Sequence, residues 1–242
     1  MLEDGSLKLR LCLDLSRHVN KAIKREPCKL ATLQTSLALL LPGDYVAVYD
    51  LASAYHHVRI REEDQQLLGF AVPRVQRGDG TEDTEEYFVF SRMPFGLATA
   101  GQVLDRVLKP IKAKLAQLGI RHSIYIDDGI ILGQSRVETA AAVHNVYKVL
   151  RAAGFQLSME KSDTAATVAQ TKEYLGFEIH TTNMTVWAPQ KKLNGVLSSV
   201  SEEIRRRGER RPAKKMSSVI GKALALEPAV GPMVQLLTRA AQ

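Results

Sequence analysis

Two neighbouring carboxylates stand at the bend of an apolar stretch of this sequence. Asp127 and Asp128 are flanked on both sides by β-branched and aromatic residues within residues 123–132. This pattern predicts a strand, a tight turn and a second strand, with both acids at the turn. Carboxylates about 4 Å apart repel by roughly 4 kcal/mol at an effective dielectric near 20, so a cation or a proton must stabilise them. An oxygen-only ligand set favours Mg²⁺ or Mn²⁺ over zinc, although an ordinary Asp-Asp turn in water fits this short segment equally well.

A third acid occurs upstream in the same kind of setting. Asp50 lies near the end of the apolar run Tyr45–Leu51. A sheet can bring an acid at a strand end next to an acid pair on a distant hairpin. Three carboxylates can hold two divalent ions, and two such ions suit in-line phosphoryl transfer. We therefore predict that Asp50, Asp127 and Asp128 are catalytic residues and metal ligands for two Mg²⁺ or Mn²⁺ ions.

The elements that must position these acids follow the order strand, helix, hairpin, helix, strand. In sequence they are expected at residues 45–51, 98–118, 123–132, 136–153 and 174–179, with a further strand at 184–187. This order is typical of a split βαβ, ferredoxin-like α+β fold. An amphipathic pattern over residues 190–204 predicts that the C-terminal part is helical.

Composition limits the possible partners and compartments. The chain has 242 residues, of which 45% are hydrophobic, and its net charge of +7 favours an anionic partner such as nucleic acid. Only two cysteines are present and no CxxC motif occurs, which indicates a reducing compartment and no structural zinc. No signal peptide and no membrane-spanning run is evident in the sequence. We expect a soluble intracellular protein, cytoplasmic or nuclear, with no membrane partner.

Five motifs in a fixed order carry a family resemblance. They read LDLSRHVNKAI, DLASAYHHVRI, MPFGLATA, YIDD and YLGFEI, at residues 13–23, 50–60, 93–100, 125–128 and 174–179. Together they resemble the palm of a reverse transcriptase, an RNA-directed DNA polymerase. The amino-acid sequences of these motifs are most similar to those of DIRS-like retrotransposons, and long-terminal-repeat elements are the next most similar group.

The resemblance implies a right-hand polymerase with a ferredoxin-like palm and a partial helical thumb. It divides the chain into partial fingers at 1–43, a palm at 44–188 and the start of a thumb or connection at 189–242. A fingers insertion interrupts the palm at about 60–92. Further fingers strands usually precede this point in the family, so we expect a fingers-palm fragment of a longer reading frame.

The resemblance also implies a reaction and a set of binding residues. The reaction is template-directed addition of dNTPs to a primer 3′-hydroxyl, on an RNA or DNA template. Leu51 joins the metal ligands, and the ring of Tyr55 lies under the sugar, which selects deoxynucleotides. The dNTP-binding candidates are Arg10, Ala54, Tyr55, Phe95 and Lys161. The template and primer candidates are Pro94, Gly96, Tyr125, Leu175 and Gly176.

Other interpretations stay open at this point. Arg10 could lie on a solvated edge strand, Tyr55 could be a half-buried core residue, and Lys161 could be an ordinary surface lysine. The chain could also be a catalytically inactive nucleic-acid-binding remnant of a retroelement. An RNA-dependent RNA polymerase shares the palm geometry, but Tyr55 and the YIDD motif argue against it. The sequence predicts no oligomeric state.

Overall fold

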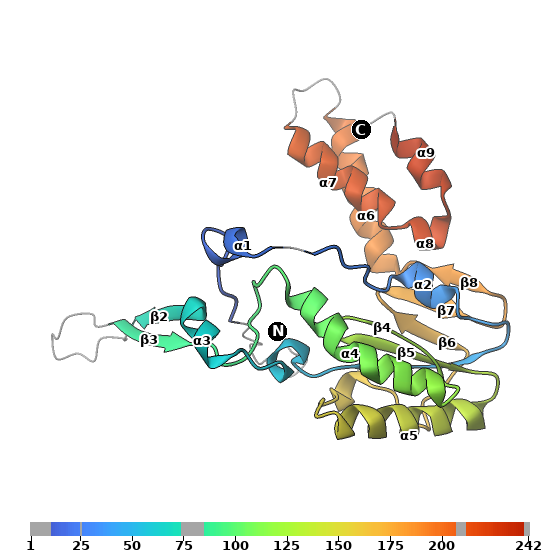
Figure 1. Ribbon diagram of the computed structural model, residues 1–242. Helices are drawn as coiled ribbons and strands as arrows, with labels where there is room; N and C mark the ends of the chain where they lie inside the picture. Colours follow the sequence, from blue (N-terminus) through green and yellow to red (C-terminus); the bar gives the residue numbers. More distant parts are fainter. Residues whose placement is uncertain (1–10, 25, 74–84, 207–211, 240–242) are drawn as a thin grey trace, which may run out of the picture.

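The computed structural model describes residues 11–24, 26–73, 85–206 and 212–239 (Figure 1). A body of sheets and helices carries a hairpin that projects on one side and a group of C-terminal helices at the top of the view. Within the described ranges, no helix is both long and apolar enough to cross a membrane. Cys12 and Cys28 are exposed and unbridged.

The central sheet consists of β1 (Tyr45–Asp50), β5 (Asp128–Gly133) and β4 (Arg121–Tyr125), paired antiparallel in the order β1-β5-β4. Both faces of β1 and β5 are covered, so these two strands are largely apolar, whereas the edge strand β4 is more polar. Because side chains alternate along a strand, Ala47 and Tyr49 face one side and Val46 faces the other.

Two helices cover the Tyr49 face of the sheet. They are α4 (Ala100–Gln117) and α5 (Arg136–Ala152), which share one hydrophobic core with the strands. The buried stripe of α4 is spaced by three or four residues and consists of Leu104, Leu108, Ile111 and Leu115. The Ser135 side chain accepts a hydrogen bond from the Glu138 amide and caps the start of α5.

The opposite face packs against α2 (Leu33–Leu37) and a second sheet of β6 (Thr171–Tyr174), β7 (Phe177–His180) and β8 (Thr185–Trp187). The prediction of one strand over residues 174–179 is wrong. Leu175 and Gly176 have φ values of 49° and 72°, so the chain reverses there and Tyr174 pairs directly with Phe177. Two consecutive positive φ values make a type I′ turn, which matches the twist of a hairpin.

An irregular segment runs along the free edge of β1, where a split βαβ fold has its last strand. Leu157 and Ala169 form isolated bridges to the two ends of β1. Between them, the Asp163 carboxylate accepts the Val48 amide at 2.8 Å, and Ser162 Oγ accepts the Asp50 amide at 3.1 Å. Across the sheet, the spatial order is therefore this segment, β1, β5 and β4. This is the order expected for the palm. The short 3-10 helix η3 (Met159–Lys161) lies within the segment.

A projecting hairpin follows β1 in the sequence. The connection contains η1 (Ala54–His57), α3 (Glu62–Gln65) and η2 (Gln66–Leu68), and the hairpin strands are β2 (Gly69–Pro73) and β3 (Glu85–Val89). Every β3 residue is exposed. The hairpin therefore extends away from the core rather than covering it (Figure 1).

The two ends of the described chain lie outside the sheets. The described N-terminal part contains α1 (Val19–Ala22) and an isolated bridge from Cys12 to Phe95. The C-terminal part is helical, as predicted. Its helices are α6 (Gln190–Arg205), α7 (Ala213–Leu224), α8 (Glu227–Val230) and α9 (Met233–Arg239).

Candidate active site

The three predicted acids meet where β1 ends and β5 begins. Asp50 pairs with Asp128 in the register of β1 and β5. Tyr125 also pairs with Asp128, so that Ile126 and Asp127 form a two-residue turn. The amide of Leu51 donates a hydrogen bond of 2.9 Å to the Asp127 carbonyl oxygen, which ties the turn to the end of β1.

The turn between β4 and β5 is conformationally strained. Ile126 has a φ of 57°, in the left-handed region that a β-branched residue rarely occupies. This position of a type II′ hairpin turn is normally glycine's. The strain costs on the order of 1–3 kcal/mol and persists because the pairing on either side fixes the turn. It sets the position of the Asp127 main chain beside β1.

The acids are coupled electrostatically. Burial, followed by the charges of Asp127 and Asp50, raises the pKa of Asp128 to about 6, and Lys161 opposes this shift. Lys161 Nζ lies 3.6 Å from Asp50 Oδ2. Lys161 thus supplies positive charge beside Asp50 and Asp128.

The carboxylate oxygens of these three acids are the kind of ligand that a hard divalent cation prefers. Carboxylate oxygens are the usual ligands of Mg²⁺, and a bound cation would relieve the repulsion that raises the pKa of Asp128. Across the described ranges, however, no three His, Cys, Asp or Glu side chains are gathered into a ready-made metal cluster. The acids fit such an ion by type, while their side chains do not converge on one point.

Two cavities share Asp50 in their lining. The first cavity has a volume of about 510 Å³ and the second about 880 Å³. Four of the predicted dNTP-binding residues line the first cavity together with Asp127, namely Ala54, Tyr55, Phe95 and Lys161. Three of the predicted template and primer residues line the second with Asp128, namely Tyr125, Leu175 and Gly176. Asp50 and Lys161 border both cavities.

Tyr55 combines a packing contact with a position in the first cavity. Its ring meets Phe95 edge to face, with the ring centroids 5.4 Å apart. Burial and, after it, the charge of Asp127 raise the pKa of the Tyr55 hydroxyl. The side chain is therefore half-buried and neutral, and it lies within the electrostatic reach of the acids.

The loop that carries Pro94 and Gly96 packs against the N-terminal segment. Pro94 is buried, and a Cβ added at Gly96, which has a φ of 103°, would overlap the Leu13 carbonyl oxygen. Asn20 Nδ2 donates to the Gly96 carbonyl oxygen at 2.8 Å. These contacts attach the loop that carries Phe95 to the N-terminal segment. Arg10 lies outside the described residues.

Sequence reasoning missed the residues that hold the Lys161 segment and β6 against the central sheet. Besides accepting the Val48 amide, the Asp163 carboxylate accepts Lys172 Nζ at 2.6 Å. The Tyr174 hydroxyl donates to the Asp128 carbonyl oxygen at 3.3 Å. Asp163 follows a lysine and a serine in a polar stretch, and no periodic pattern marks it. Its partner on β1, Val48, lies 115 residues away in the sequence.

Comparisons with known proteins agree with this architecture. Residues 5–179 match the family model for reverse transcriptase (RNA-dependent DNA polymerase). The retrovirus-related Pol polyprotein from transposon gypsy of Drosophila melanogaster is 27% identical over 173 residues, which cover 72% of this chain and 15% of the relative. The transposon Tf2-3 polyprotein of Schizosaccharomyces pombe is 28% identical over 156 residues, which cover 64% of this chain and 11% of the relative. The chain thus spans a small part of each relative.

Solved structures show the same fold. The foamy viral protease-reverse transcriptase dRH in complex with double-stranded DNA matches with a TM-score of 0.70 and 21% identity, over 96% of this chain and 36% of that one. The foamy viral protease-reverse transcriptase in complex with an RNA/DNA hybrid matches with a TM-score of 0.59 and 20% identity, over 87% of this chain and 25% of that one. The α+β fingers-palm fold and the retrotransposon kinship predicted from the sequence are confirmed, while the DIRS-like subgroup stays a prediction. The chain belongs to the reverse transcriptase (RNA-dependent DNA polymerase) family.

Proposed function

We propose that this chain is the fingers and palm of an RNA-directed DNA polymerase that adds dNTPs to a primer 3′-hydroxyl. The observation that carries this proposal is the division of the candidate residues between two cavities that share Asp50. A polymerase must hold an incoming nucleotide and a primer end on opposite sides of its catalytic acids. We retain the division into partial fingers at 1–43, a palm at 44–188 with an insertion at about 60–92, and the start of a thumb at 189–242.

The catalytic role falls to the acids at the end of β1. Asp50, Asp127 and Asp128, with the main chain of Leu51, would hold two Mg²⁺ or Mn²⁺ ions. When bound, such ions lower the pKa of the primer hydroxyl and neutralise charge on the triphosphate. Lys161 adds a positive charge beside Asp50 and would contact phosphate oxygens. No covalent enzyme intermediate is required.

The binding roles follow from the two cavities. In the first cavity the Tyr55 ring would lie under the deoxyribose and leave no room for a 2′-hydroxyl, and Phe95 would offer an apolar surface beside it. In the second cavity Tyr125 and the Leu175–Gly176 turn would hold the primer end near Asp128. Arg10 is proposed to contact the triphosphate, and Pro94 and Gly96 to set the template side of the Phe95 loop.

Support for nucleic acid as the partner comes from two directions. The foamy viral structures that share this fold are complexes with double-stranded DNA and with an RNA/DNA hybrid. The net charge of +7 favours binding to a polyanion. We propose a primed RNA or DNA template as the partner and dNTPs as the second substrate.

Extension of a DNA primer on an RNA template tests this proposal. We expect Mg²⁺-dependent extension by the wild type and none by Asp127→Asn, because the substitution removes one carboxylate charge with little change in shape. Both proteins should bind the primed duplex with the same dependence on salt. Duplex binding by the wild type without extension, with any metal or template, would instead identify an inactive nucleic-acid-binding remnant and contradict the proposal.

A further inference from the structure

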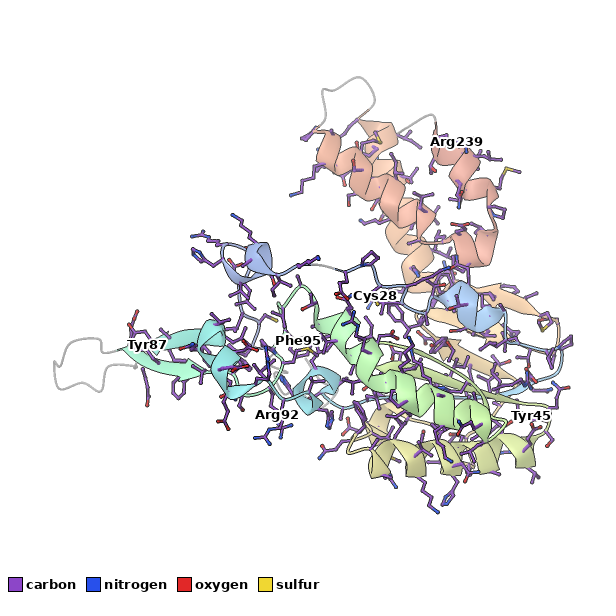
Figure 2. The ribbon with its side chains drawn as sticks, in the orientation of Figure 1. Cys28, Tyr45, Tyr87, Arg92, Phe95 and Arg239 are labelled. Atoms are coloured by element: carbon purple, nitrogen blue, oxygen red, sulfur yellow. The ribbon has the colours of Figure 1, made fainter. Side chains whose placement is uncertain are left out.

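The free edge of β1 changes its hydrogen-bond partners as the strand approaches the candidate active site. Figure 2 shows Tyr45, the first residue of β1, well apart from Phe95 of the first cavity. Near Tyr45, the main chains of Val46 and Ala169 exchange two hydrogen bonds, of 2.8 and 3.2 Å, as paired strands do. Towards Asp50, the amides of β1 donate to side chains instead. The change therefore occurs where β1 reaches the acids.

Two serines on either side of a helical turn hold the main chain of Asp50. The Asp50 amide donates to Ser162 Oγ at 3.1 Å, and the Asp50 carbonyl oxygen accepts the Ser158 amide at 2.9 Å. In a regular strand, residues four apart lie about 13 Å from each other, so both could not contact one residue. The η3 turn between the serines shortens this separation. Lys161 is the last residue of the turn, and its Nζ lies 3.6 Å from Asp50 Oδ2.

Asp163 fixes the chain directly after the turn. Its Oδ2 accepts the Val48 amide, and its own amide donates to the Val48 carbonyl oxygen, both at 2.8 Å. The other carboxylate oxygen, Oδ1, accepts Lys172 Nζ and Thr167 Oγ1, each at 2.6 Å. The Asp163 carbonyl oxygen accepts the Tyr147 hydroxyl at 2.5 Å. Because the Asp163 and Lys172 side chains are only 11% and 17% exposed, water weakens this anchor little.

We propose that Ser162 and Asp163 are positioning residues, which hold the η3 turn so that Lys161 stays beside Asp50 during nucleotide addition. Neither is among the described residues that line the two cavities, so neither is expected to touch a substrate. On its other side β1 is held by β5, so loss of either contact should free the turn rather than the strand. This role rests on the proposed function, which assigns Asp50 and Lys161 to the reaction. The alternative is that both side chains only satisfy buried main-chain groups and stabilise the fold.

Double-mutant cycles of single-nucleotide incorporation test the coupling to Lys161. We expect Ser162→Ala and Asp163→Asn each to lower kcat/KM for the dNTP by about tenfold, the effect of losing one buried hydrogen bond. When either is combined with Lys161→Met, the further loss should not exceed about twofold, because a turn without its lysine has no charge left to position. Thr164→Ala removes an exposed side chain from the same segment and is the matched control, so it should leave kcat and KM unchanged.

Zero-length crosslinking measures the position of Lys161 without any substrate. A carbodiimide joins an amine to a carboxylate only where the two groups meet, so the wild type should give a Lys161–Asp50 crosslink that mass spectrometry detects. Both single variants should lose most of this product. The Lys112–Asp105 pair on α4, whose Nζ and Oδ1 atoms are 2.6 Å apart, is the internal control and should crosslink equally in all the proteins.

Two results would overturn the inference. Losses of equal size for Ser162→Ala with and without the Lys161→Met change would show that the hydroxyl only stabilises the fold. An unchanged Lys161–Asp50 crosslink in both single variants would show that the turn keeps its place without these side chains. If the wild type incorporates no nucleotide, the proposed function fails, and the crosslink still decides whether Ser162 and Asp163 hold Lys161 beside Asp50.

Discussion

At the scale of single residues, two carboxylates near the ends of β1 have opposite environments. Asp44 is fully buried, and the Arg121 guanidinium donates to its two oxygens at 2.6 and 2.7 Å. Burial alone raises the pKa of Asp44, but hydrogen bonds from Arg121, Leu41 and Gln134 outweigh it and hold the pKa below its usual value. The pKa of Asp128, which faces other carboxylates, is raised. The paired acid is structural and the repelled acid is a candidate for chemistry.

Replacing Asp44 should therefore change stability in a pH-dependent way. Asp44→Asn should lower the free energy of unfolding by about 3 kcal/mol at pH 7, because it breaks a buried ion pair. Since the pKa of Asp44 is lowered from 3.8, the stabilisation is complete above that pH and is lost as the pH falls through the folded-state pKa. Urea unfolding at several pH values measures the difference between the two proteins, which should shrink below about pH 4. A difference independent of pH would contradict the assignment.

Tyr55 gives a second prediction at this scale. If its ring limits the space beside the sugar, Tyr55→Ala should raise ribonucleotide incorporation relative to deoxynucleotide incorporation, on the order of tenfold to a hundredfold. Tyr55→Phe retains the ring and should leave the ratio unchanged. Single-nucleotide incorporation with each substrate measures the ratio. An unchanged ratio in Tyr55→Ala would leave the residue with only its packing role against Phe95.

At the scale of elements, the fit between β1 and β5 depends on a glycine. Tyr49 pairs with Gly129, and a Cβ at that position would overlap the Tyr49 ring. The ring is held by His122, which stacks on it and lies 2.5 Å from its hydroxyl oxygen. It cannot move aside without a loss of packing. The strand that begins with Asp128 thus depends on a residue without a side chain.

Gly129→Ala should lower the free energy of unfolding by about 1–3 kcal/mol, the usual cost of overpacking a core. The control is Gly195→Ala in α6, where a Cβ would meet no atom within 4 Å. This control should raise stability by up to about 1 kcal/mol, because alanine favours a helix. Thermal or urea unfolding of both variants checks the pair. A neutral Gly129→Ala variant would show that the β1–β5 contact is looser than the structure indicates.

At the scale of the whole molecule, the parts predicted correctly from the sequence are those with local patterns. The apolar run before Asp50, the YIDD hairpin and the long helices each carry a periodic signal, and their order fixes the palm. The turn at Leu175–Gly176 was missed because it interrupts an apolar run whose composition favours a strand. The edge of β1 could not be predicted, since an irregular segment pairs with it through both main-chain groups and side chains such as Asp163, and no periodicity marks this segment. The roles of the site residues are predictions that the fold accommodates and experiments must test.

The most direct test of the central claim is the rate of single-nucleotide incorporation as a function of Mg²⁺ concentration. We predict a saturable rate for the wild type and a loss of at least about a thousandfold for Asp50→Asn, because the substitution removes a carboxylate that both cavities share. Asp64→Asn is the matched control, since Asp64 forms an exposed ion pair with Arg61 and should leave the rate unchanged. Incorporation by Asp50→Asn at the wild-type rate and Mg²⁺ dependence would contradict the claim that these carboxylates form the catalytic site.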